Sequence, residues 1–193
     1  MTEKNQTPQP VVIVDDMLSA SLEVDPVVIA QTMQELGISN PGITNTTLHI
    51  DDKRHFLYKG SQTPKSLDRV LRNPSEVNEG EGSVIRVSTN IRGRELDAET
   101  MNQTLVHELE HVAQTDRKDT KMKIGNLAIW GLAAAGLVVG NYLGKKSGSK
   151  ITRAVSPVIG FAIGHQMGYR IAPHERQARA RAKEVKTTAI LRK

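Results

Sequence analysis

The order of hydrophobic and polar positions divides the chain into four stretches. Residues 1–10 are polar, residues 11–123 mix short β-prone runs with amphipathic patterns, residues 124–169 are mostly apolar, and residues 170–193 are rich in Lys and Arg. Mixed runs with periods of two and 3.6 residues are typical of an α+β domain. We therefore expect a disordered N-terminal tail, an α+β domain, an apolar helical hairpin and a basic C-terminal helix.

The pattern in the α+β domain predicts an early helix and three short strands. Asp25 and Pro26 are typical of a helix start, the apolar positions of 27–36 fit one helical face, and Gly37 fits the helix end. Runs of β-branched and apolar residues predict strands at 46–50, 55–58 and 83–89.

A longer helix, predicted over about 97–117 with Asp97 as its N-cap, carries the most specific motif, H-E-L-E-H. His107 and His111 are four residues apart, so both imidazoles lie on one helical face and can reach a single ion. A catalytic zinc site keeps one position for water and needs a third protein ligand, and Glu108 can then act as general base. Because a chain of this composition contains the motif by chance roughly once in a hundred cases, a solvated helix is the alternative interpretation.

The third ligand has several candidates after His111. The acidic and imidazole side chains in that part of the chain are Asp116, Asp119, His165, His174, Glu175 and Glu184. Arg117 stands where a metzincin would carry its third His, which excludes that class. Glu175 is the best placed, because Pro173 fits a helix start and small residues beside the Glu would let this helix approach the motif helix. The alternative is an ordinary first-turn acid that complements the helix dipole.

Composition limits the chemistry further. The chain has no Cys, one Trp, two Phe and three Tyr, so its core must be aliphatic and it offers no thiolate ligand or nucleophile. Most of the net charge of +5 comes from residues 170–193, which hold eight Lys/Arg and two Glu. That stretch has no aromatic residue for base stacking, so we expect no nucleic-acid partner. Residues 1–10 lack a signal-peptide pattern, so we expect the N-terminus to stay in the compartment of synthesis.

The apolar region predicts two antiparallel helices. Residues 124–144 carry no charge over 21 positions, enough for a helix to cross about 30 Å of hydrocarbon, and residues 154–169 form a shorter uncharged segment. Glycines recur at every fourth position in both segments, at Gly136, Gly140 and Gly144 and at Gly160, Gly164 and Gly168. Such stripes let helices pack closely within one chain or in an oligomer. We expect a membrane-spanning pair whose flanking Lys and Arg keep the catalytic domain and both termini cytoplasmic. A soluble hairpin, or one that lies in the interface, is the alternative.

The order of these features resembles a known family. An HExxH helix, an apolar hairpin and a helix with Glu and a nearby Ala are similar to the gluzincin zinc metallopeptidases. Within them, the chain resembles most the membrane-integral HtpX-type heat-shock peptidases and the CAAX prenyl endopeptidases. The string VHELEHV at 106–112 is similar to their motif helix. The string ERQA at 175–178 is similar to the E-x-x-A of compact gluzincins that cleave phage repressors.

The resemblance covers about 84–182 and implies a small zincin-like domain with the hairpin inserted in it. It implies that Zn²⁺ binds to His107, His111 and Glu175, with Glu108 as the general base. It also implies that the strand before the motif helix lies at the rim of the site, where a peptide can add as an extra strand.

Two features depart from the family pattern. Arg179 replaces the acidic residue that usually follows the ligand Glu, and the N-terminal pair of membrane helices of the HtpX-type enzymes is absent. The sequence predicts a zinc-dependent endopeptidase at a membrane surface, with a peptide or protein substrate and membrane lipid as partners. Candidates for stabilising the oxyanion are Tyr58, Arg92 and Arg94. The alternatives are a non-enzymatic membrane hairpin module and a soluble gluzincin that cleaves a regulatory protein.

Overall fold

The computed structural model describes residues 12–14, 21–38, 46–51, 60–64 and 83–193. Contacts divide the chain into two compact units, one of Met1–Arg117 with Ala180–Lys193 and one of Lys118–Arg179. The predicted tail, the strand expected at 55–58 and Tyr58 lie outside the described residues. Helices and short sheets together make the chain an α+β protein, as expected.

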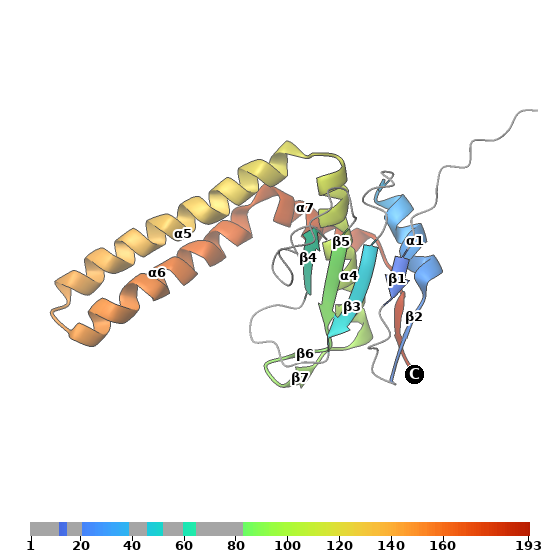
Figure 1. Cartoon of the computed structure of the whole chain (residues 1–193), viewed down its shortest axis with the longest axis horizontal. Helices are drawn as coiled ribbons and strands as arrows, with labels where there is room; N and C mark the ends of the chain where they lie inside the picture. The colour runs from blue at the N-terminus through green and yellow to red at the C-terminus, as the bar shows by residue number, and fades with distance from the viewer. Residues whose placement is uncertain (1–11, 15–20, 39–45, 52–59, 65–82) are drawn as a thin grey trace, which may run out of the picture. The chain divides into compact units, whose positions relative to one another are not determined.

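The first unit contains a four-stranded mixed sheet with the order β1-β3-β5-β4 (Figure 1). Its strands are β1 (Val12–Val14), β3 (Thr46–Asp51), β4 (Gly60–Pro64) and β5 (Ser83–Ser88). β5 is parallel to β3, with Thr47 opposite Val84, and antiparallel to β4, with Thr63 also opposite Val84. β1 extends the sheet beyond β3 in parallel, with Val12 opposite Thr46.

The central position of β5 corrects the expectation that this strand lies at a rim. Both of its edges are hydrogen-bonded, one to β3 and one to β4, so a peptide has no edge there to pair with. The physical reason is visible in its sequence, because Val84 is buried on one face of the strand and Ile85 and Val87 are buried on the other. A run that is apolar on both faces is typical of an inner strand.

Two helices of the first unit begin and end as their sequences predict. Asp25 caps α1 (Pro26–Glu35) by accepting hydrogen bonds from the backbone N–H groups of Val27 and Val28, and Gly37 follows the helix with a φ of 75°. Asp97 caps α4 (Ala98–Asp116). Its Oδ1 lies 2.6 Å from the Thr100 backbone nitrogen, and this hydrogen bond holds the pKa of the Asp97 carboxyl below its usual range.

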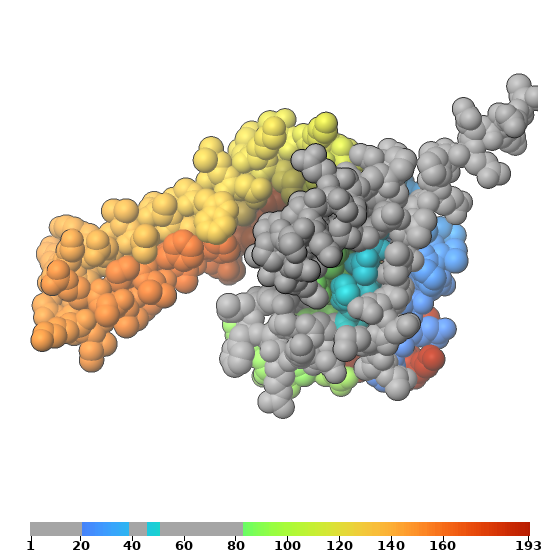
Figure 2. Space-filling model, in the orientation of Figure 1, coloured from blue at the N-terminus to red at the C-terminus, as the bar shows by residue number. Residues whose placement is uncertain are grey.

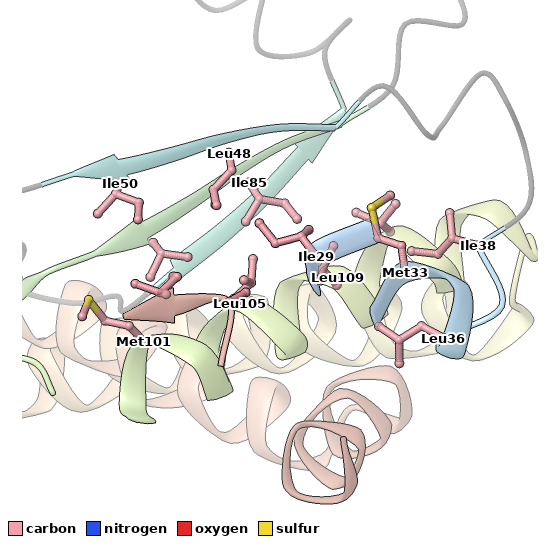
Figure 3. Packing of buried hydrophobic residues seen from close by; sticks show 14 of the residues in the cluster. Ile29, Met33, Leu36, Ile38, Leu48, Ile50, Ile85, Met101, Leu105 and Leu109 are labelled. Atoms are coloured by element: carbon pink, nitrogen blue, oxygen red, sulfur yellow. The ribbon is translucent and has the colours of Figure 1, made fainter. Parts of the chain in front are cut away.

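An aliphatic core fixes α1 and α4 against the sheet. Ile29 and Met33 of α1 and Leu105 of α4 point toward the strands, where Leu48 and Ile85 meet them (Figure 3). All five side chains are at most 1% exposed. Burial of each such side chain contributes about 1.5–3 kcal/mol, so α4 is held rigidly on the sheet. The expectation of an aliphatic core is confirmed for the described residues.

The C-terminal end of the chain differs from the continuous basic helix that its composition predicts. Helix α7 (Pro173–Glu184) ends at Glu184, and the chain then forms strand β8 (Ile190–Arg192), which pairs antiparallel with β2 (Leu22–Val24). The buried Asn102 side chain of α4 accepts a hydrogen bond from the Ile190 backbone N–H and donates one to its carbonyl, each at 2.8 Å. Three residues inside a basic stretch give no sequence signal for a strand whose partner lies near the N-terminus.

A small hairpin completes the first unit. Strands β6 (Asn90–Ile91) and β7 (Arg94–Glu95) pair antiparallel, and the turn between them holds Arg92 and Gly93 at positive φ. Arg92 and Arg94 are exposed.

The second unit is a pair of long antiparallel helices, α5 (Thr120–Lys146) and α6 (Lys150–Ile171). Both are longer than the uncharged segments, because Asp119 and Ser149 cap them in the polar flanks. They lie against each other along their length (Figure 2). Among the described helices, α5 is the one long and apolar enough to cross a membrane by length and composition.

The glycine stripes of the two helices face each other. A Cβ added at Gly136 would collide with the carbonyl oxygen of Gly160, and one added at Gly160 would collide with that of Gly136. The same holds along the hairpin for Gly140 against Ser156 and for Gly164 against Leu132. The stripes therefore serve close packing inside one chain.

The large apolar side chains of the hairpin point away from this seam. Leu127 and Ile151 are 75% and 77% exposed. Exposed residues of the same kind run along both helices and include Trp130, Val138, Val139, Tyr142, Val158, Ile163 and Met167. Small residues inside and large apolar residues outside is the reverse of a water-soluble helix pair.

The substitution Gly160→Leu should separate α5 from α6, because a leucine there meets the rigid backbone of Gly136 at a cost of about 1–3 kcal/mol or more. Spin labels at the exposed positions Val138→Cys and Val158→Cys can report this in a chain without native Cys. We expect a narrow distance distribution by pulsed EPR in the parent and a longer, broader one in Gly160→Leu. Gly131→Leu, which enters open space on α5, is the control and should change nothing. An unchanged distribution in Gly160→Leu would contradict the packing.

Candidate metal centre

The two histidines of the HExxH motif meet on one face of α4. The Nε2 atoms of His107 and His111 are 3.2 Å apart, and the two rings are nearly perpendicular, with centroids separated by 4.8 Å. His111 is buried and His107 is half-buried. The i, i+4 spacing thus directs the same nitrogen of each ring at one point.

Gln114 fixes the orientation of His111. Its Oε1 lies 3.0 Å from His111 Nδ1. Because an amide oxygen only accepts, this hydrogen bond requires the His111 tautomer in which Nδ1 carries the proton and donates it to Gln114. In the neutral ring, Nε2 then has the lone pair, and it is this nitrogen that faces His107. Gln114 is fully buried and lies outside the HExxH motif, but its i+3 position on the same helix is a sequence signal that it can reach His111.

An ion pair between the buried Glu110 and the exposed Arg117 anchors the end of the motif helix. Glu110, which is fully buried, accepts a hydrogen bond from Arg117 Nη2 at 2.6 Å, and Arg117 Nη1 donates to the Leu36 carbonyl at 3.0 Å. Leu36 is the C-cap residue of α1. Arg117, which occupies the third-His position of a metzincin, thus ties α4 to α1.

Glu175 is the third residue of α7 and is buried. The boundary between the two units falls after Arg179, so this helix starts in the second unit and ends in the first. His107, His111 and Glu175 each offer one ligand atom, and these atoms all lie within 4.8 Å of one another. Two imidazoles and one carboxylate are a donor set that could hold a metal ion.

Glu108 and the remaining candidates have other positions. Glu108 follows His107 on α4 and is 6% exposed. Five other candidate ligands do not belong to the metal-binding group in the described part of the chain: Asp116, Asp119, His165, His174 and Glu184. Asp119 caps α5, and Glu184 pairs with Arg181. The ring of His165 contacts those of Trp130 and Phe161 on the hairpin.

The structure gives Arg179 a role of its own. Its Nη2 donates to the carbonyls of Arg170 and Tyr169, at 3.0 and 3.3 Å, and its guanidinium lies 5.7 Å from the centre of the Tyr169 ring. These carbonyls belong to the last turn of α6, which has no intrahelical donors for them. Arg179 therefore holds the corner between α6 and α7, where the family pattern would have an acidic residue.

No protein-family model, curated protein or solved structure matches this chain. Function is therefore argued from the residues and geometry of the site.

Replacing Gln114 by Leu should change the tautomer of His111, because the acceptor of the Nδ1 proton is lost while the volume is nearly kept. In metal-free protein at pH 8, long-range ¹H–¹⁵N spectra should show His111 as the Nδ1–H form in the parent. The variant should show a mixture with the Nε2–H form. Gln114→Glu keeps an acceptor and is the control. If Gln114→Leu retains the parental tautomer, Gln114 does not set it.

Proposed function

We propose that the chain is a zinc-dependent peptidase in which His107, His111 and Glu175 hold the ion and Glu108 is the general base. The observation that carries the proposal is the 3.2 Å separation of the two Nε2 atoms. Two imidazole nitrogens bound tetrahedrally to one Zn²⁺ are about 3.3 Å apart, given Zn–N distances of 2.0–2.1 Å. The same separation suits a hydrogen bond between the rings when no ion is bound.

The donor set supports zinc as the ion. Neutral imidazole nitrogens with one carboxylate form the His₂Glu set of catalytic zinc sites, which leaves a position for water. Gln114 supports this role, because a hydrogen bond at Nδ1 directs the lone pair of His111 Nε2 toward the ion and raises its basicity. Because His111 and Glu175 are buried, bulk water has little access to these two ligands and competes less with them for the ion.

Zinc, when bound, polarises the scissile carbonyl and lowers the pKa of the attacking water toward neutrality. Glu108 takes the proton of that water and passes it to the nitrogen of the leaving amine. Its position next to His107 on a helix held by the aliphatic core keeps the base near the ion without making it a ligand. The α+β architecture, with the motif helix packed on a mixed sheet, is compatible with a zincin-like fold.

We also propose that the hairpin associates with a membrane and brings the site to its surface. The outward apolar side chains of α5 and α6 support this, because in the absence of a membrane they would be exposed to water. The length of α5 supports a spanning position, whereas α6 contains Pro157, His165 and Gln166. The substrate would then be a peptide segment at the membrane surface.

The substitution Glu108→Gln should leave zinc binding intact and lower turnover of a fluorescently labelled unfolded protein about 10²–10⁴-fold, because the amide cannot accept the proton of water. His111→Ala should lose stoichiometric zinc. Glu99→Gln, an exposed acid in the first turn of the same helix, is the control and should change neither property. Full activity in Glu108→Gln, or stoichiometric zinc in His111→Ala, would exclude this mechanism.

The double substitution Leu127→Glu/Val138→Glu tests membrane association. Both side chains are exposed on α5, and carboxylates at these positions are costly in hydrocarbon but harmless in water. We expect the parent to stay in the membrane fraction after alkaline extraction and the variant to be released. Lys145→Glu, at the end of α5, is the charge control. Release of the parent would show that the hairpin is not integral.

A further inference from the structure

We propose that His174 is a positioning residue for the Glu175 carboxylate. We further propose that Gly125 is required because only glycine leaves room for the His174 ring. The N-terminal part of α5 would thus help to fix the orientation of the third ligand, Glu175. This inference deepens the proposed function and rests on it. All of the contacts that carry it lie in the second unit.

Gly125 leaves room for the His174 ring on the surface of α5. A Cβ added at Gly125 would collide with Nδ1 and Cε1 of His174 and would lie 3.2 Å from its Cγ. His174 is only 3% exposed, and Gly125 is buried. The φ angle of Gly125 is one that any residue can adopt in a helix, so the glycine is needed for space. Because glycine inside a helix destabilises it by about 1 kcal/mol relative to alanine, its presence here indicates a packing requirement.

The His174 ring lies close to the carboxylate of Glu175, the next residue of α7. His174 Nε2 lies 3.6 Å from Glu175 Oε1. Consecutive side chains on a helix diverge by about 100°, so this approach requires the two side chains to turn toward each other. A buried carboxylate with a ring nitrogen beside one oxygen has fewer accessible rotamers, which favours a fixed direction for a metal ligand.

A second contact holds the same two helices in register. Lys121 Nζ donates to Gln177 Oε1 at 3.2 Å, one turn before Gly125 on α5 and one turn after His174 on α7. Arg179 holds the other side of α7 to the end of α6. Helix α7 is therefore held by both helices of the hairpin. A shift of α5 would move His174 and, through it, Glu175.

The test compares Gly125→Ala with Gly131→Ala in the full-length chain in detergent. Both variants replace a glycine of α5 by alanine and gain the same helix propensity, but a Cβ at Gly131 meets nothing within 4 Å. The readouts are zinc affinity by chelator competition and the visible spectrum of the Co²⁺-substituted protein, which reports the ligand set. We expect Gly125→Ala to weaken zinc binding roughly 10–100-fold and to alter the spectrum, and Gly131→Ala to match the parent.

His174→Phe separates positioning from packing, because phenylalanine keeps a ring against Gly125 but has no nitrogen beside Glu175. We expect it to weaken zinc binding about as much as Gly125→Ala, and we expect Gly125→Ala/His174→Ala to be no worse than His174→Ala alone. Parental affinity and spectrum in His174→Phe, or in a folded Gly125→Ala, would overturn the inference. If Gly125→Ala does not fold, His174→Phe decides alone. Absence of zinc from the parent itself would instead overturn the proposed function.

Discussion

The hydrogen bonds between the Asn102 carboxamide and the backbone of Ile190 are the constraint that closes the first unit around its motif helix. The chain leaves the first unit after Arg117, forms the hairpin and returns to the first unit at Ala180. Asn102 lies on the helix that carries His107 and His111. Ile190 belongs to β8, which follows the hairpin in sequence and pairs with β2. An unmet buried amide or backbone group costs about 1–3 kcal/mol, so this closure is strongly favoured. Within the first unit, it joins the segment that follows α7 to the helix that carries the two imidazoles.

The hairpin obeys a different physical rule from the α+β unit. In the first unit large aliphatic side chains face inward and the hydrophobic effect holds α4 on the sheet. In the hairpin the glycines face inward and backbone approaches backbone, while residues such as Trp130 and Val138 face outward. Because this seam buries few large apolar side chains, the hydrophobic effect stabilises it little, and packing of this kind is typical of helices among lipid tails. Both kinds of packing in one chain are consistent with the proposed combination of a zinc site and a membrane-associated hairpin.

Much of this arrangement can be predicted from local sequence signals. The caps Asp25 and Asp97 and the end of α1 at Gly37 follow from turn chemistry. The two long helices follow from two uncharged apolar segments with a glycine at every fourth position. Features that depend on remote partners cannot be predicted in this way: β8 needs β2, and the central place of β5 is set by two strands distant in sequence. The same applies to the site. The spacing of His107 and His111 indicates a shared ion, whereas the role of Arg179 appears only when the end of α6 is seen beside it.

X-ray absorption at the zinc edge of the purified full-length chain tests the central claim most directly. The account predicts one zinc per chain in a four-coordinate shell of nitrogen and oxygen ligands at about 2.0–2.2 Å, with outer-shell scattering from two imidazole rings. Substitution of Glu175 by Gln should change the first shell and leave the two rings in place. A chain without stoichiometric zinc, or a zinc shell with fewer than two imidazoles, would contradict the account.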